Sequence, residues 1–239
     1  MDGKKLSQKL FVIFFGGFKS KIAVVCGVLL LILSLPSSLL AMLVVIDPAH
    51  GGEDFGVSAG RIIEKDVTLR MARYLRDELQ HRGISVRLTR DDDRDVSIKQ
   101  RRNIAAAVQA DALIGLHLNS GFGKDARGFS LYLPMVAQQA SAQEEQEKIL
   151  ADMVSTNVLN DSIMLATEIE KSLIGTLSLA SRGVYHLSTP LTRNADLPTV
   201  VLEIGFISNA DEEKSLINDA YQREIARAIA TGIANSLQQ

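Results

Sequence analysis

Cysteine is almost absent from this 239-residue chain, and tryptophan is absent altogether. The single cysteine, Cys26, lies in an apolar N-terminal stretch, so residues 42–239 can form no disulfide and can use no thiolate as a nucleophile or metal ligand. Any metal site in that part of the chain must therefore be built from His, Asp and Glu. Aromatic residues are also scarce, at 5%, and the formal net charge is −2. A chain without a basic, aromatic-rich surface is not expected to bind nucleic acid.

The first 41 residues differ in character from the rest. Five lysines precede an uncharged apolar stretch, residues 22–41, which contains Pro36 and ends in the small residue Ala41. This order is typical of a secretory signal peptide. A retained signal-anchor is the alternative, because the apolar residues after position 38 lengthen the stretch toward a membrane span. We expect export to the periplasm or cell envelope, with inner-membrane anchoring through residues 22–41 as the alternative.

The whole chain has 46% hydrophobic and 23% charged residues, which is typical of a globular protein. Residues 42–239 are expected to form one domain, because this length suits a single domain of ordinary size. Apolar, β-type runs alternate with helical patterns. The runs are often continuous, which indicates strands covered on both faces. We predict a single α/β domain with a mostly parallel or mixed central sheet flanked by helices. The expected strands are 43–48, 84–89, 112–118, 129–134, 183–188 and 199–206, and the expected helices are 64–82, 97–110, 161–177 and 219–237.

One segment, residues 135–160, departs from this alternation. It is first polar and acidic and then amphipathic, and it separates an expected strand from an expected helix. Two interpretations are open: the segment is an ordinary surface excursion, or it forms a helix that lies over a functional site.

Two of the four histidines come at the ends of apolar runs. His50 ends VVIDPAH and His117 ends ALIGLH, whereas His81 and His186 have settings that suggest structural roles. Ligand sites in open α/β sheets form beyond the carboxyl ends of strands, so His50 and His117 are expected to be neighbours although 67 positions separate them.

Two glutamates complete a candidate site. Glu64 opens a predicted helix, and Glu203 interrupts the apolar run VVLEIGF. Burying a carboxylate there is costly unless it is paired, bound to a metal or used in chemistry. A buried ion pair with an arginine is one interpretation. The other is a zinc site in which His50, Glu64 and His117 are ligands and Glu203 is a general base, with Asp47 orienting His50.

Several separated blocks carry a family resemblance. IDPAHGGEDFG, IIEKDVTLRMARYLRDEL, ISVRLTRDDD, IKQRRNIA, ADALIGLHLN and LPTVVLEIGFISN resemble, in order, the zinc-dependent N-acetylmuramoyl-L-alanine amidases of the Amidase_3 type. The resemblance implies that His50, Glu64 and His117 bind Zn²⁺ and that Glu203 is catalytic. It also implies a peptidoglycan substrate, cleaved between the lactoyl group of N-acetylmuramic acid and L-alanine during cell-wall remodelling or daughter-cell separation.

The resemblance also gives residues 135–160 a meaning. They look like the end of a shortened regulatory insertion, which implies partial autoinhibition and a LytM-type activator protein. Two positions depart from the family pattern: Ala49 stands where glycine is usual and Leu118 where alanine is usual. Both flank proposed ligands, so we expect them to narrow the cleft or alter its dynamics. Another cell-wall zinc peptidase, or a non-catalytic wall-binding protein with a relict site, are the alternative functions.

Overall fold

The computed structural model describes residues 42–121, 125–135 and 145–237. The predicted signal or signal-anchor, residues 1–41, lies outside the described residues. Among the helices that are described, none is long and apolar enough to cross a membrane.

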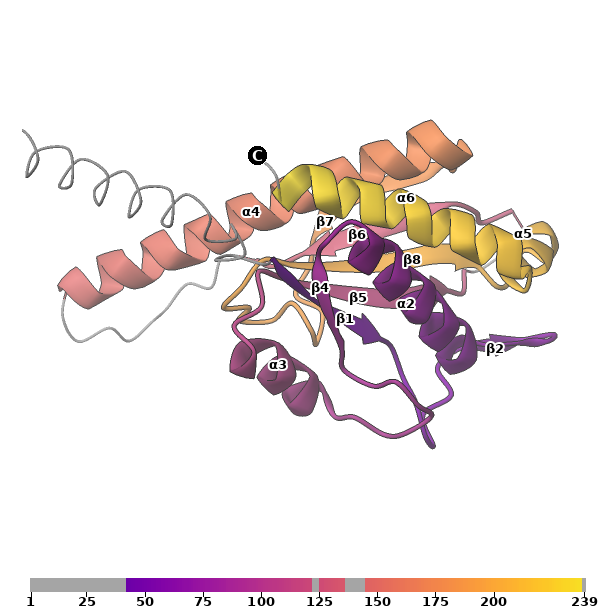
Figure 1. Ribbon diagram of the computed structural model, residues 1–239, viewed down its shortest axis with the longest axis horizontal. Helices are drawn as coiled ribbons and strands as arrows, with labels where there is room; N and C mark the ends of the chain where they lie inside the picture. Colours follow the sequence, from indigo (N-terminus) through magenta and orange to yellow (C-terminus); the bar gives the residue numbers. More distant parts are fainter. Residues whose placement is uncertain (1–41, 122–124, 136–144, 238–239) are drawn as a thin grey trace, which may run out of the picture. The chain divides into compact units, whose positions relative to one another are not determined.

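The domain is organised around a six-stranded mixed sheet in the order β4-β1-β5-β8-β6-β7 (Figure 1). Neighbouring strands run parallel except β6 and β8, which are antiparallel. The predicted mostly parallel or mixed sheet is therefore confirmed. The strands are β1 (Leu43–Pro48), β4 (Ser85–Leu88), β5 (Ala112–Asn119), β6 (Phe129–Leu133), β7 (Ser181–His186) and β8 (Thr199–Phe206).

Helices cover both faces of the sheet. The long helices α2 (Glu64–His81), α4 (Glu145–Leu177) and α6 (Asp219–Leu237) lie on one side, and the short α3 (Ile98–Ala107) lies on the other (Figure 1). Alternating side chains of β1 divide between these layers, because Val44 and Ile46 join the large core while Val45 joins a smaller cluster with Ala105 of α3. The continuous apolar run of β1 thus reflects a strand buried on both faces.

Most predicted elements agree with the structure to within a few residues. The helix α2 ends at His81 and is followed by Gly83 in a left-handed conformation, as the C-terminal glycine predicts. Ser97 forms the predicted cap of α3, with a capping box to Gln100. The sequence did not predict the β2 (Ser58–Ala59) and β3 (Ile62–Ile63) hairpin or α5 (Ala210–Leu216), which are too short to show periodicity.

The helix α4 is the main difference. It begins at Glu145 and not at Asp161, so the second half of the 135–160 segment is helical, while residues 136–144 lie outside the described residues. No glycine or proline interrupts residues 145–174, which explains why the helix is continuous. Its later turns pack on α6, where Gly232 has no room for a Cβ against the backbone at Ile169.

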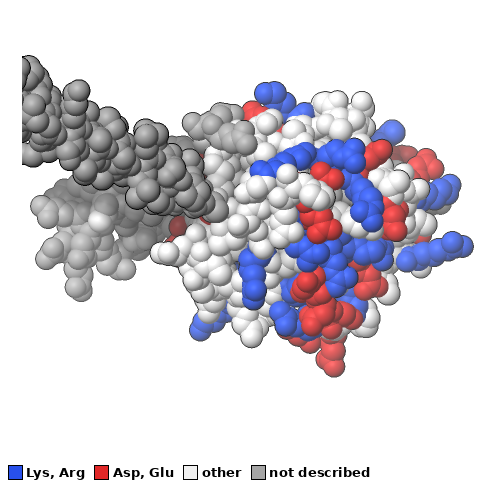
Figure 2. Space-filling view, viewed as in Figure 1, with Lys and Arg blue, Asp and Glu red and all other residues white. Residues whose placement is uncertain are grey.

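Charged side chains on the face seen in Figure 2 are mixed, with lysine and arginine interspersed among aspartate and glutamate. This face presents no broad basic area of the kind that a phosphate backbone requires.

Candidate metal centre and active site

Three of the predicted site residues lie at or near the carboxyl ends of neighbouring strands in the sheet. His50 follows β1 by two residues, His117 lies near the end of β5, and Glu203 lies in β8. The strands β1 and β8 both pair in parallel with β5, and His117 lies opposite Glu203 in the register. Glu64, the first residue of α2, joins them through the β2–β3 hairpin that returns the chain from the His50 loop.

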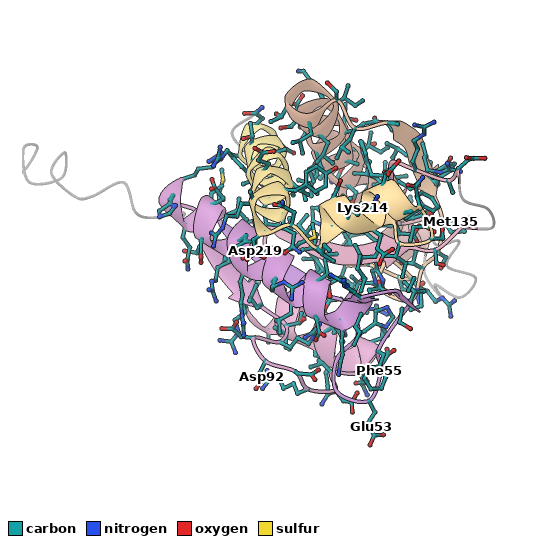
Figure 3. All side chains as sticks on the ribbon, turned by 90° about the vertical axis from the view of Figure 1, so that its right-hand side faces the viewer. Glu53, Phe55, Asp92, Met135, Lys214 and Asp219 are labelled. Carbon is teal, nitrogen blue, oxygen red and sulfur yellow. The ribbon has the colours of Figure 1, made fainter. Side chains whose placement is uncertain are left out.

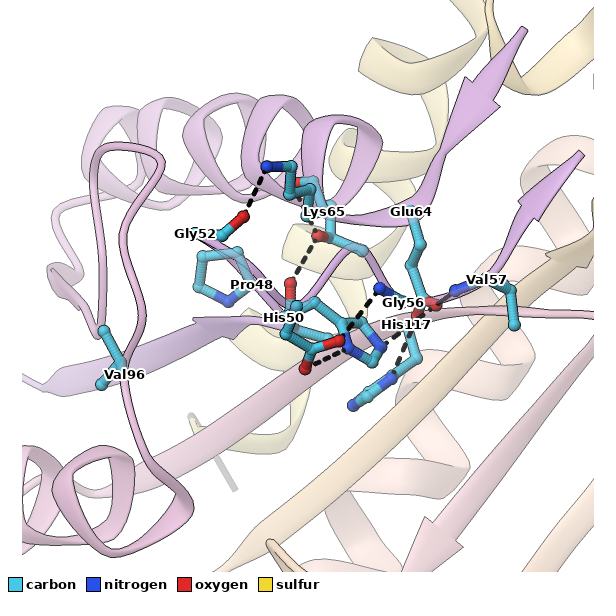
Figure 4. A network of polar contacts seen from close by, with 12 residues as sticks. Pro48, His50, Gly52, Gly56, Val57, Glu64, Lys65, Val96 and His117 are labelled. Carbon is cyan, nitrogen blue, oxygen red and sulfur yellow. Dashed lines mark hydrogen bonds and ion pairs between the residues drawn. The ribbon is translucent and has the colours of Figure 1, made fainter.

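His50, Glu64 and His117 form one compact group (Figure 4). Nε2 of His50 lies 3.1 Å from Oε2 of Glu64, and Nδ1 of His117 lies 3.1 Å from Oε1 of the same carboxylate. The two imidazole rings meet edge to face, with centroids 5.2 Å apart. One donor atom from each residue lies within 4.8 Å of the others, so the group could hold a single metal ion.

Glu64 is held as a buried carboxylate. Its residue is only 1% exposed, and burial alone would raise its pKa. Hydrogen bonds from both histidines, together with the backbone N–H groups of Val57 and Leu118 at 2.9 Å each, outweigh burial and hold the pKa well below its usual range. Two imidazoles and an ionised carboxylate are a donor set that suits a divalent metal such as zinc.

The loop that carries His50 has an unusual backbone. His50 has φ +61°, a left-handed conformation that is uncommon for residues other than glycine. Gly56 has φ +64°, and a Cβ added there would lie 2.5 Å from both Oε2 of Glu64 and Cδ2 of His50. Glycine at position 56 is therefore required both by the backbone conformation and by the space that the metal-binding group occupies.

Asp54, and not Asp47, contacts the His50 ring. Oδ2 of Asp54 lies 2.8 Å from Nδ1 of His50, which leaves Nε2 facing Glu64. The predicted role of Asp47 in orienting the ring is wrong, because Asp47 is turned into the domain and accepts hydrogen bonds from Thr89 and Arg101. The sequence offered a signal for Asp54, since it lies four residues after His50 in a glycine-rich turn.

Glu203 is fixed through one of its two oxygens. The amide Nδ2 of Asn119 and the hydroxyl of Tyr132, the latter at 2.9 Å, both donate to Oε2. The Tyr132 ring stacks on Tyr185 with centroids 5.8 Å apart. Burial raises the pKa of Glu203 more than the Tyr132 hydrogen bond and the nearby His117 lower it. The buried ion pair with an arginine, considered from the sequence, is not among the interactions of Glu203 in the described residues.

A cleft of about 590 Å³ joins these groups. Its lining includes His50, His117 and Glu203, and residues 96–98 at the N-terminus of α3 and residues 189–191 also contribute.

Two other expectations concern residues away from the cleft. His81 and His186 lie outside the metal-binding group, as predicted. Of residues 145–160, none whose side chain is described lines this cleft.

The two departures from the family pattern have different surroundings. Ala49 is among the residues that line the cleft, and its expected effect on cleft width or dynamics stays a prediction. Leu118 is 4% exposed and belongs to the hydrophobic core, because successive residues of β5 point to opposite faces. The expectation that its side chain narrows the cleft is therefore wrong.

Comparison with known proteins agrees with this geometry. The family model for N-acetylmuramoyl-L-alanine amidase (Amidase_3) matches residues 44–235. This chain belongs to the Amidase_3 family.

Named relatives and solved structures agree with the family match. N-acetylmuramoyl-L-alanine amidase AmiA of Escherichia coli is 29% identical over 214 residues, covering 80% of this chain and 74% of that protein. The structure of amidase AmiC2 of Nostoc punctiforme is 28% identical, with a TM-score of 0.70 over 83% of this chain and 98% of that chain. The CwlD amidase of Clostridioides difficile, solved in complex with the GerS lipoprotein, is 26% identical, with a TM-score of 0.69 over 82% and 98%.

Proposed function

We propose that this Amidase_3 protein is a zinc-dependent N-acetylmuramoyl-L-alanine amidase that removes stem peptides from peptidoglycan during cell-wall remodelling. The bond cleaved is the amide between the lactoyl group of N-acetylmuramic acid and L-alanine. The observation that carries the proposal is a metal-binding group of His50, Glu64 and His117 whose two histidines line one cleft together with Glu203.

The metal ligands in this proposal are His50 through Nε2, His117 through Nδ1, and Glu64. Zinc bound to these ligands would supply Lewis-acid polarisation of the substrate carbonyl and activation of a water molecule. A histidine that binds a metal usually donates its other ring N–H to a hydrogen-bond acceptor. In His50 that acceptor is the Asp54 carboxylate beside Nδ1, which fixes the tautomer.

Glu203 is proposed as the general base. Because Asn119 and Tyr132 both donate to Oε2, Oε1 is the oxygen left to take a proton from the attacking water. The same oxygen then gives the proton to the leaving nitrogen of L-alanine as the C–N bond breaks. Burial raises the pKa of Glu203, which makes the carboxylate a stronger base than an exposed glutamate.

Two alternative functions differ from the amidase in their products or in the site that they need. A zinc peptidase that cuts elsewhere in the stem would use the same chemistry, so product identity separates it from the amidase. A non-catalytic wall-binding protein would have no need of a half-buried carboxylate held by two donors beside a metal-binding group.

The test is digestion of purified peptidoglycan with zinc-loaded protein, with chelator-treated protein and with the Glu203→Gln variant, followed by mass analysis. The amidase releases intact stem peptides that begin with free L-alanine, and only the zinc-loaded wild-type protein does so. Peptides cut internally would indicate a peptidase, and no release under any condition would indicate a binding protein.

Export of the protein to the periplasm or cell envelope fits a peptidoglycan substrate. We infer that residues 1–41 direct this export, either as a cleaved signal peptide or as an inner-membrane anchor through residues 22–41. N-terminal sequencing of the protein from the envelope fraction tests this inference, because a new N-terminus near Met42 indicates cleavage and an intact Met1 indicates an anchor.

Residues 135–160 are proposed as a shortened regulatory insertion, responsive to an activator of the LytM type. Four exposed apolar side chains on the first turns of α4 support a protein-binding role for this segment: Ile149, Leu150, Met153 and Val154. Deletion of residues 138–158 should raise basal hydrolysis of sacculi. Unchanged activity, or lost activity in a protein that still folds, would contradict autoinhibition.

A further inference from the structure

Two buried arginines hydrogen-bond to the main chain next to the metal-binding group. Arg90 follows β4 and Arg101 lies in α3, and the two residues are 0% and 4% exposed. The buried carboxylate of Asp47 pairs with the positive charge of Arg101, with Oδ1 of Asp47 2.6 Å from Nη1 of Arg101. Burying two guanidinium groups is costly, so their placement calls for a specific role.

Arg101 binds the main chain on both sides of Ala49. Its Nη1 donates to the carbonyl oxygen of Pro48 at 2.8 Å, and its Nη2 donates to the carbonyl oxygen of His50 at 2.7 Å. Its Nε donates to the carbonyl oxygen of Val96 at 2.8 Å, which ties the cleft wall to the same group. The bond to His50 holds in place the residue with the left-handed backbone.

Arg90 joins two ligand-bearing segments. Its Nη2 donates to the carbonyl oxygen of Ala49 and to that of Lys65, both at 2.8 Å. Ala49 precedes His50 and Lys65 follows Glu64, so one nitrogen bridges the neighbours of two proposed ligands. Nε of Arg90 also donates to the carbonyl oxygen of Pro48 at 3.0 Å.

We propose that Arg90 and Arg101 are positioning residues that preorganise the metal site before metal arrives. Together they satisfy three consecutive carbonyl groups, those of residues 48–50, and fix that loop relative to the start of α2. Without them, the strained left-handed conformation of His50 would compete with relaxed loop conformations that cannot bind metal. The apparent metal affinity would then fall in proportion to the fraction of molecules in the competent conformation. This inference rests on the proposed metal centre.

Lysine substitutions provide the test, because lysine keeps the charge but loses the planar fork that contacts several carbonyl groups. Zinc affinity is measured by competition with a chromogenic chelator for Arg90→Lys, Arg101→Lys and Arg102→Lys. Arg102 is the matched control, since it lies next to Arg101 in α3 and donates to a main-chain carbonyl at Asn194, away from the ligand loop. We expect at least about 10-fold weaker zinc binding for the first two variants and less than 2-fold change for the control.

A purely structural role would give a different result. In that case the lysine variants would unfold at lower urea concentration, yet the folded fraction would bind zinc as the wild type does, and the proposal would be overturned. The visible spectrum of Co²⁺-loaded protein gives a second readout, because displaced ligands alter the coordination geometry and hence the band intensities.

A measurement on the wild-type protein covers the case in which a variant does not fold. Hydrogen exchange of the hydrogen-bonded amides of Ala49, Gly51, Gly52 and Asp54 in metal-free protein should already be slow, because the arginines hold this loop without metal. Protection that appears only after zinc is added would contradict preorganisation. Failure of the wild-type protein to bind zinc would instead contradict the proposed metal centre itself.

Discussion

Nδ1 of His50 lies 2.8 Å from Oδ2 of Asp54, and Oδ1 of the same carboxylate accepts a hydrogen bond from the backbone N–H of Gly56 at 3.0 Å. Asp54 is thereby held in one orientation although its side chain is 62% exposed. A carboxylate in this position favours the proton on Nδ1, so Nε2, which faces Glu64, is the nitrogen that would bind a metal.

Asp54→Asn should therefore weaken zinc binding by about 10- to 100-fold, because the neutral amide holds the Nδ1 proton less strongly. Equilibrium competition with a chelator measures the effect. The control is Glu53→Gln, which removes an equal charge from a neighbouring side chain that points away from the domain (Figure 3). Equal losses in the two variants would indicate a general effect of charge and not a contact with His50.

Glu203→Gln should reduce kcat for release of stem peptides by about 10²- to 10⁴-fold, because the amide cannot accept the proton of water. Zinc affinity should stay within about threefold of the wild type, since Glu203 is not among the proposed ligands. Stem-peptide release and chelator competition measure the two quantities. Loss of zinc binding together with activity would reassign Glu203 as a ligand.

The same variant has a predictable effect on the metal-free fold. Burial raises the pKa of Glu203 above its value in the unfolded chain, so the protonated form stabilises the fold at low pH. That stabilisation is lost as pH rises from the unfolded pKa through the raised folded pKa. The free energy of unfolding of the wild type should therefore fall relative to that of Glu203→Gln as pH rises through this range. Urea denaturation at several pH values without metal measures the difference. A difference that is constant with pH would exclude the raised pKa.

Tyr132→Phe should lower kcat by about 10-fold, with little change in zinc affinity, because one of two donors that orient Glu203 is lost. The phenyl ring retains the stacking on Tyr185, so the fold is expected to survive. Tyr185→Phe is the control, since its hydroxyl donates to the carbonyl oxygen of Arg182 and does not contact Glu203. A similar fall in kcat for both variants would point to a general disturbance of β6 and β7.

Gly56→Ala should disrupt metal binding, because the added Cβ would lie 2.5 Å from atoms of both His50 and Glu64. Gly83→Ala is a matched control with φ +78° and no atom within 4 Å of the added Cβ. Both variants bear the left-handed strain of about 1–2 kcal/mol, which urea denaturation measures. Only Gly56→Ala should lose zinc affinity, and similar affinities in both would show that the space at position 56 is not critical.

The amino-acid sequence determined the class of fold and the candidate site residues of this protein. Continuous apolar runs predicted doubly covered strands, and histidines at the ends of two such runs predicted neighbours at one sheet edge. Glu203 was recognisable because an ionisable group within an apolar strand has a high cost of burial. These signals are local, or follow from general rules of sheet topology, and therefore can be read without coordinates.

The tertiary structure alone decided what supports those residues. Pairing of Tyr132 with Glu203 depends on the antiparallel placement of β6 beside β8, which no local pattern encodes. The same is true of Arg90, whose position beneath the ligand loop results from β4 lying next to β1. Such contacts join residues more than 40 positions apart, so only the folded chain brings their atoms within hydrogen-bonding distance.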